Sequence, residues 1–206
     1  MVYGQSYLID QNGQVIKEPK VSGESQERDL AWLLKKWPSG YQTAFRKSVL
    51  TDILEQQYTD YPGFDYHDVL FGMLAPLYGK VVCLDQLLDQ HRIHQANVTQ
   101  SASSLSFNKT RLSRINYLQK VISRYESVQK IAEERQISEA DHRQLARALA
   151  LTNLRLKLLQ SRNPFWALGL MFQIREYRTI KDFISDLVYT YSLNGVARRL
   201  LKKFGR

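Results

Sequence analysis

Histidines and aspartates near the middle of the chain are the residues best suited to bind a metal ion. His91 and His94 lie three positions apart, Asp85 and Asp89 precede them, and His67 is followed by an aspartate. A zinc or two-metal centre needs three or four converging ligands. The histidine pair supplies two ligands, and no recognisable motif places a third. We therefore expect solvated or helix-capping histidines, with neither a metal nor another cofactor.

Motifs of covalent or nucleotide-dependent catalysis are missing from the sequence. Cys83, the single cysteine, lies between Val82 and Leu84 in an apolar stretch, whereas a reactive thiol needs a lowered pKa and a nearby base. There is no serine nucleophile elbow, no P-loop and no Gly-x-Gly-x-x-Gly run. We expect Cys83 to be a small buried residue in a helix, and we expect the protein not to be an enzyme.

The main functional signal is a pair of predicted helices between Lys109 and Arg162. Apolar residues recur in both at spacings of three and four, which is the pattern of a helix packed against other helices. The seam positions are Ile115, Leu118, Ile122 and Tyr125 in the first helix, and Leu145, Leu149, Thr152, Leu156 and Leu159 in the second. The remaining sides of both helices carry lysines and arginines.

Positive charge is concentrated in the C-terminal half of the chain. Residues 1–108 hold 9 Lys and Arg against 12 Asp and Glu, a balance of −3, whereas residues 109–206 hold 20 against 8, a balance of +12. Such a field attracts polyanions and accelerates their association. The candidate partners are a nucleic acid, an anionic membrane surface and an acidic protein.

Like-charged neighbours on the two basic helices favour the nucleic acid among these partners. Lys120 and Arg124, and likewise Arg143 and Arg147, are i, i+4 pairs whose repulsion destabilises an isolated helix slightly. Phosphates along a backbone would relieve that repulsion and release counterions. The expected contacts are Arg111, Arg114, Lys120, Arg124, Arg143, Arg147 and Arg155, together with Arg198, Arg199 and Lys202 on the last helix. No helix-turn-helix, zinc finger or aromatic ribonucleoprotein motif supports base-specific recognition.

Local signals along the chain predict a mostly α fold, a bundle of about seven helices preceded by one β-hairpin. Asn12-Gly13 between two short apolar runs predicts the hairpin. Helix signals predict further elements over residues 26–37, 42–58, 65–89, 109–136, 138–162, 165–177, 179–193 and 196–206. Pro76 predicts a kink or break in the third of these, and the apolar start of the segment 165–177 predicts a buried helix.

The division of charge and a polar stretch without Lys, Arg, Asp or Glu predict three regions. Residues 1–95 form the hairpin and an acidic-to-neutral helical half, residues 96–108 form a linker or mobile loop, and residues 109–206 form a basic helical half. The two halves are also compatible with one continuous domain.

These observations favour a non-catalytic helical module that binds a nucleic-acid backbone with low sequence specificity, as a subunit of a larger nucleoprotein complex. The sequence does not distinguish DNA from RNA. One alternative is a protein–protein adaptor or chaperone that binds an acidic partner. Another is a peripheral membrane protein that uses the basic amphipathic segment 196–206. We expect no secretory signal, no transmembrane segment and a cytoplasmic location, because no basic N-terminal segment precedes an apolar run.

Overall fold

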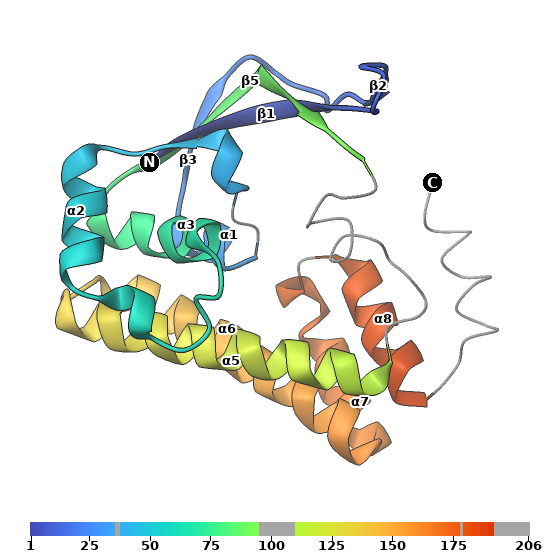
Figure 1. The fold of residues 1–206 in the computed structure, drawn as a ribbon. Coiled ribbons are helices and arrows are strands. Elements are labelled where there is room, and N and C mark those ends of the chain that lie inside the picture. Colours follow the sequence, from blue (N-terminus) through green and yellow to red (C-terminus); the bar gives the residue numbers. More distant parts are fainter. Residues whose placement is uncertain (36–37, 95–109, 178, 192–206) are drawn as a thin grey trace. The chain divides into compact units, whose positions relative to one another are not determined.

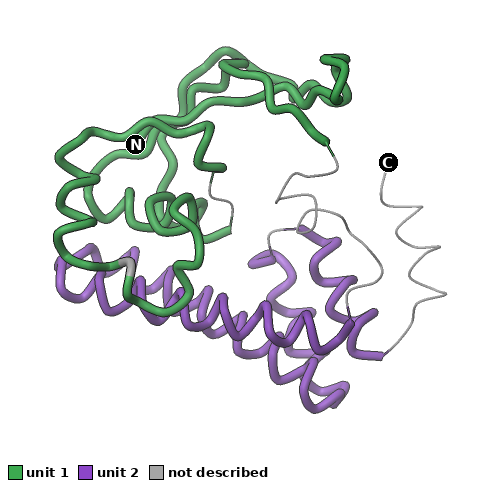
Figure 2. The backbone as a smooth tube through the Cα atoms, in the orientation of Figure 1, with its two compact units in different colours: residues 1–105 green, residues 106–206 purple. Residues whose placement is uncertain are grey.

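The computed structural model describes residues 1–35, 38–94, 110–177 and 179–191 (Figure 1). Backbone contacts divide the chain into two compact units, Met1–Leu105 and Ser106–Arg206 (Figure 2). Among the described residues, seven α-helices make the protein mostly helical, as expected. The N-terminal strands, however, form a five-stranded sheet rather than a lone hairpin.

The sheet of unit 1 is built around two long neighbouring strands, β1 (Val2–Ile9) and β5 (Val81–Arg92), which run parallel. Two short strands, β2 (Val15–Lys17) and β4 (Thr43–Ala44), pair antiparallel with opposite ends of β1. The other edge of β5 pairs antiparallel with β3 (Ser25–Arg28). The order β2-β1-β5-β3 therefore leaves β2 and β3 at the two ends of the described sheet (Figure 1).

The expected hairpin is present as β1 and β2, with a longer connection than the two-residue turn. Residues 10–14 join the strands, and Gly13 has the positive φ of 87° that this position favours in glycine. The Asp10 carboxylate accepts from the backbone N–H groups of Asn12 and Gln14, at 2.9 and 2.8 Å. An aspartate side chain therefore organises the turn.

The helices of unit 1 are shorter than the sequence patterns predicted. They are α1 (Leu30–Lys35), α2 (Lys47–Glu55) and α3 (His67–Tyr78), with single 3₁₀ turns at Gly40–Gln42 and Tyr58–Asp60. The helix predicted over residues 26–37 was wrong at its start, because residues 25–28 pair with β5 instead. The Asp29 carboxylate accepts from Trp32 N at 2.8 Å, as a residue that caps the start of a helix does, and α1 therefore begins after Asp29.

The long helix predicted over residues 65–89 was wrong in its second half. Helix α3 continues past Pro76 to Tyr78 and ends at Gly79, after which Val81 to Arg92 form β5. Leu84 and Leu88 fit a helical seam by spacing, but pairing with β1 and β3 fixes them in a strand. Cys83 is buried, as expected, although in β5 rather than in a helix; it packs with Tyr3 and Leu33 in the core of unit 1.

Unit 2 consists, over residues 110–191, of helices and their connections. They are α5 (Arg111–Glu134), α6 (Glu139–Ser161), α7 (Pro164–Phe172), a 3₁₀ turn at Ile174–Glu176, and α8 (Ile180–Tyr191). Two of these helices have a side-chain cap with an aspartate three positions later: Ser138 accepts from Asp141 N, and Thr179 accepts from Asp182 N, each at 3.2 Å. The predicted segments 96–108 and 196–206 lie outside the described residues, as do Arg198, Arg199 and Lys202.

The prediction that residues 165–177 form a buried helix was wrong. Helix α7 is shorter, and only one of its sides packs against the rest of unit 2, through Leu170, Trp166 and Ala167. Its other side leaves large apolar residues exposed. The sequence pattern correctly indicated an apolar helix. Hydrophobicity alone, however, does not show that other residues pack against both sides of a helix.

Gly79 should tolerate a side chain poorly because of its backbone conformation. Its φ of 150° and ψ of −160° lie in a region that is nearly restricted to glycine. Gly79→Ala should lower the free energy of unfolding by about 1–3 kcal/mol, measured by urea unfolding. Gly169→Ala is the matched control, because its new Cβ would make an ordinary contact at 3.6 Å with Leu154; it should be neutral or stabilising. Equal losses in both variants would contradict this account.

Candidate nucleic-acid interface

Helices α5 and α6 pack against each other through the apolar seam that the sequence predicted, with a shift in some positions. Leu118 and Tyr125 of α5, and Leu145 and Leu159 of α6, are buried as expected. Ile115, Ile122, Leu149 and Leu156 are only half-buried, whereas the buried residues also include Val121, Val128, Ile131, Leu151 and Leu158. Burial along both helices therefore follows the helical period, and on α6 it includes Leu151 and Leu158, which belong to a cluster with Leu170 of α7.

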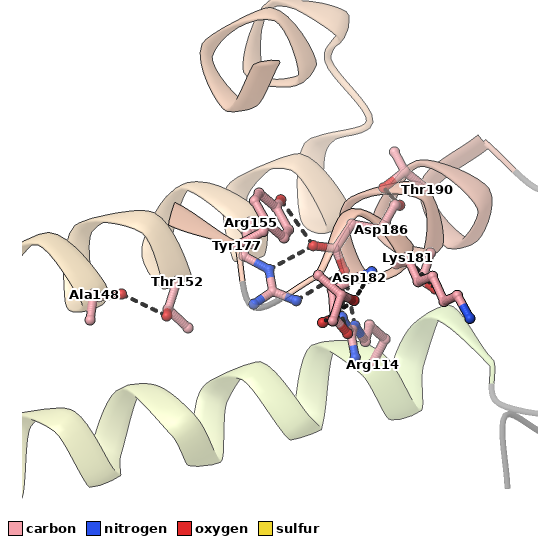
Figure 3. Close-up of polar contacts among 11 residues, drawn as sticks. Arg114, Ala148, Thr152, Arg155, Tyr177, Lys181, Asp182, Asp186 and Thr190 are labelled. Carbon is pink, nitrogen blue, oxygen red and sulfur yellow. Dashed lines mark hydrogen bonds and ion pairs between the residues drawn. The ribbon is translucent and has the colours of Figure 1, made fainter. Parts of the chain in front are cut away.

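A fully buried carboxylate, Asp186 of α8, holds two of the expected phosphate contacts (Figure 3). Arg114 of α5 reaches it through Nε and Nη2, both at 2.9 Å from Oδ1. Arg155 of α6 donates from Nε to Oδ2 at 2.6 Å, and the hydroxyl of Tyr177 donates to the same oxygen at 3.1 Å. Helices α5, α6 and α8 are therefore joined by one charged cluster.

The electrostatics of this cluster follow from its burial. Burial by itself lowers the pKa of Arg155, but the charge of Asp186 and the hydrogen bonds to it outweigh burial and raise that pKa above its usual range. Burial and the same carboxylate charge raise the pKa of Tyr177. Arg155 thus stays charged and Tyr177 stays neutral at physiological pH. Both side chains donate hydrogen bonds to Asp186 inside unit 2.

Of two further expected contacts, Arg111 is bonded within unit 2 and Arg124 is buried. Arg111 donates to the backbone carbonyls of Leu159 and Gln160, in the last turn of α6. These carbonyls have no partner within their own helix, and a cation there also meets the negative end of the helix dipole. Arg124 is buried, with 6% of its surface exposed. Arg111 therefore stabilises a helix end, and Arg124 lies in the interior.

Lys120, Arg143 and Arg147 are the expected contacts that are exposed within the described residues. Arg143 and Arg147 share one side of α6 with exposed Lys157, and these three residues are named the α6 line below. At 3.6 residues per turn they fall within about 80° around the helix axis and extend over about 21 Å. Arg143 pairs with Glu139 at 3.4 Å, but both side chains are highly exposed, and such pairs contribute little. Within the described residues, no carboxylate pairs with Arg147.

Other chemically capable residues do not converge in the part of the chain that the structure describes. No group of three or more His, Cys, Asp or Glu residues there could hold a metal ion. His91 stacks on Tyr41, with ring centroids 4.3 Å apart and planes 7° from parallel. No described helix combines the length and the apolar character that crossing a bilayer requires.

The cluster around Asp186 is the feature that sequence reasoning missed. One signal could have revealed it: Asp186 falls among Phe183, Leu187 and Thr190 on the side of α8 that faces the core. An acidic residue at a core position requires a cationic partner, because a buried unpaired charge is costly. The arginines of α5 and α6 were the candidates for that cationic partner.

Comparisons with protein-family models, with curated proteins and with solved structures found no match to this chain. Any function must therefore be argued from the geometry of the described residues.

Removal of the buried charge should destabilise unit 2 strongly. Asp186→Asn removes the main counter-charge of the largely buried Arg155 and leaves Arg114 with only the more distant Asp182, so the free energy of unfolding should fall by about 3–5 kcal/mol, measured by urea unfolding followed by circular dichroism. Asp182→Asn is the control on the same helix: its carboxylate is partly exposed and lies 4.0 Å from Arg114. That variant should lose less than about 1 kcal/mol. Similar losses in the two variants would show that the cluster is not a main source of stability.

Stability of unit 2 should also fall at alkaline pH because of Tyr125. Burial, assisted by the nearby Tyr117, raises the pKa of this phenol to about 12, whereas an unfolded tyrosine titrates near pH 10. Between these values an unfolded chain loses the Tyr125 proton that the folded chain keeps, so the contribution of Tyr125 to the free energy of unfolding falls as pH rises, by about 3 kcal/mol. Urea unfolding between pH 8 and pH 12 measures this loss.

Tyr125→Phe should make that alkaline fall shallower, since the variant has no phenol to ionise at this position. Tyr66→Phe is the control, because Tyr66 is 60% exposed and in unit 1; it should leave the fall unchanged. An identical pH profile for wild type and Tyr125→Phe would contradict the assignment.

Proposed function

We propose that the protein is a non-catalytic module that binds a nucleic-acid backbone through the α6 line, as a cytoplasmic subunit of a larger nucleoprotein complex. The observation that carries the proposal is the alignment of Arg143, Arg147 and Lys157 on one exposed side of a straight element. Their span of about 21 Å corresponds to about six 3.4 Å steps of a nucleic-acid strand. Contacts of this kind position a backbone and do not read base sequence.

The binding surface in this proposal is narrower than the ten contacts expected from the sequence. Arg111, Arg114 and Arg155 are bonded within unit 2 and Arg124 is buried, so replacement of any of these four residues would weaken binding only by disturbing the fold. Lys120 is exposed on α5, and the proposal includes it as a further backbone contact. The proposed contacts for mutagenesis are therefore Lys120, Arg143, Arg147 and Lys157.

The role as a subunit is supported by the end of the sheet in unit 1. Strand β2 pairs with β1 on one edge only within the described residues, and Val15 and Ile16 on it are 54% and 58% exposed. An open edge with apolar side chains is a common template for a strand from another chain. The proposal accordingly assigns protein partners to unit 1 and the nucleic acid to unit 2.

The salt dependence of binding tests the nucleic-acid proposal. Fluorescence anisotropy with single- and double-stranded DNA and RNA should show affinity falling linearly with salt on logarithmic axes. Arg143→Gln/Arg147→Gln should reduce that slope by about 1.4–1.8, since each phosphate contact contributes about 0.7–0.9. Lys130→Gln/Arg135→Gln removes the same charge from exposed residues outside the α6 line. This control should reduce the salt slope by less than half of the reduction in Arg143→Gln/Arg147→Gln.

Two results would overturn this proposal. One is the absence of binding to every nucleic acid at low salt, which would leave the adaptor for an acidic protein as the alternative to pursue. The other is an equal loss of slope in the two double variants, which would mean that net charge rather than the α6 line determines binding.

A further inference from the structure

Helix α7 presents four large apolar side chains to the surface. Phe165, Leu168, Met171 and Phe172, named the α7 face below, are 75%, 53%, 57% and 90% exposed. Their spacings of three, three and one place them on one side of the helix. Exposed apolar groups that are contiguous, rather than scattered, mark binding surfaces in soluble domains.

The rest of unit 2 holds this helix in place, so the α7 face is exposed by the way the helix is capped and packed. Asn163 caps the helix by accepting from Phe165 N at 3.0 Å, and Pro164 occupies its first position. The opposite side packs through Leu170, Trp166 and Ala167 onto a cluster with Leu158 of α6. A rigid support of this kind keeps the four side chains outward at little additional entropic cost on binding.

Exposed cations stand at both ends of helix α7. Arg162 precedes the helix and Arg175 follows it. A third cation, Lys157 of α6, lies over the ring of Trp166 on the packed side of the helix, with Nζ 5.4 Å from the ring centroid. Helix α7 itself has no charged residue, and Glu176 is the one acidic residue from Arg162 to Glu176. The segment that carries the α7 face is therefore net positive.

The combination of an apolar side and a cationic border decides between the possible occupants. A nucleic acid offers no apolar surface to the phenylalanines. A second copy related by two-fold symmetry would bring the cations Arg162 and Arg175 close to the same cations of its partner. The interfacial region of an anionic membrane matches both properties, since it takes apolar side chains below the headgroups and attracts lysine and arginine to them.

We propose that α7 is a membrane-surface anchor that inserts the α7 face among the headgroups of an anionic bilayer. This inference does not depend on nucleic-acid binding through Arg143 and Arg147. It also differs from an anchor at residues 196–206, because every residue that carries it belongs to the described part of unit 2.

Co-sedimentation of the full chain with vesicles tests this inference. The wild-type protein should bind vesicles of phosphatidylserine and phosphatidylcholine and bind pure phosphatidylcholine vesicles more weakly, with binding to the former declining as salt rises. Phe165→Ser/Phe172→Ser should reduce the partition coefficient on anionic vesicles by about 100-fold, since burial of each phenylalanine accounts for at least about tenfold. Arg162→Gln/Arg175→Gln should lower the partition coefficient on the anionic vesicles, so that it comes closer to the value on pure phosphatidylcholine vesicles.

A matched control separates the α7 face from general surface hydrophobicity. Leu112→Ser/Ile180→Ser also removes two large apolar side chains of unit 2, 65% and 57% exposed, and should change the partition coefficient by no more than about twofold. Circular dichroism of both double variants confirms folding, and binding of Phe165→Ser/Phe172→Ser to nucleic acid should be unchanged.

Three outcomes would overturn the membrane anchor. The wild-type protein could fail to bind anionic vesicles. Phe165→Ser/Phe172→Ser and Leu112→Ser/Ile180→Ser could lose vesicle binding equally. Alternatively, the wild-type protein could self-associate in sedimentation velocity without binding vesicles, with Phe165→Ser/Phe172→Ser monomeric, which would identify the α7 face as an interface between copies of this chain.

Discussion

The packing of unit 2 depends on one buried charge, the carboxylate of Asp186. It accepts hydrogen bonds from Arg114 of α5, from Arg155 of α6 and from Tyr177, and it lies on α8. A buried carboxylate is tolerated only when its charge and lone pairs are satisfied. Three helices must therefore keep their relative positions for the cluster to exist, and this requirement limits the cations that remain for an external ligand.

Elements defined by neighbouring residues could be predicted from the sequence. The two long helices of unit 2 follow from apolar residues spaced by three and four, and the caps at Ser138 and Thr179 follow from an aspartate three positions later. The roles of Arg114 and Arg155 could not be predicted in this way. Their partner lies 72 and 31 positions away in the chain, and only the packing of the helices brings it near.

The errors in unit 1 and in α7 also concern distant parts of the chain. Leu84 and Leu88 continue a helical spacing, yet Gly79 ends the helix and pairing with β1 determines the strand. Local spacing does not detect such pairing. For α7, the sequence showed an apolar segment, but Phe172 is exposed because nothing in the described part of unit 2 packs over it. The same misjudged side chains define the proposed membrane surface, as expected where a local rule is broken for function.

The parallel pairing of β1 with β5 has a consequence for the order in which unit 1 can be assembled. Val2 lies beside Val82, so β1 cannot complete its pairing until β5, which follows it by about 80 residues in the chain, has also been synthesised. Contacts between such distant positions raise the contact order of the unit and slow its folding. During that interval the edge of β1 that later pairs with β5 is open to pairing with other chains. Nascent chains of this protein should therefore need chaperone protection until residue 92 has been synthesised.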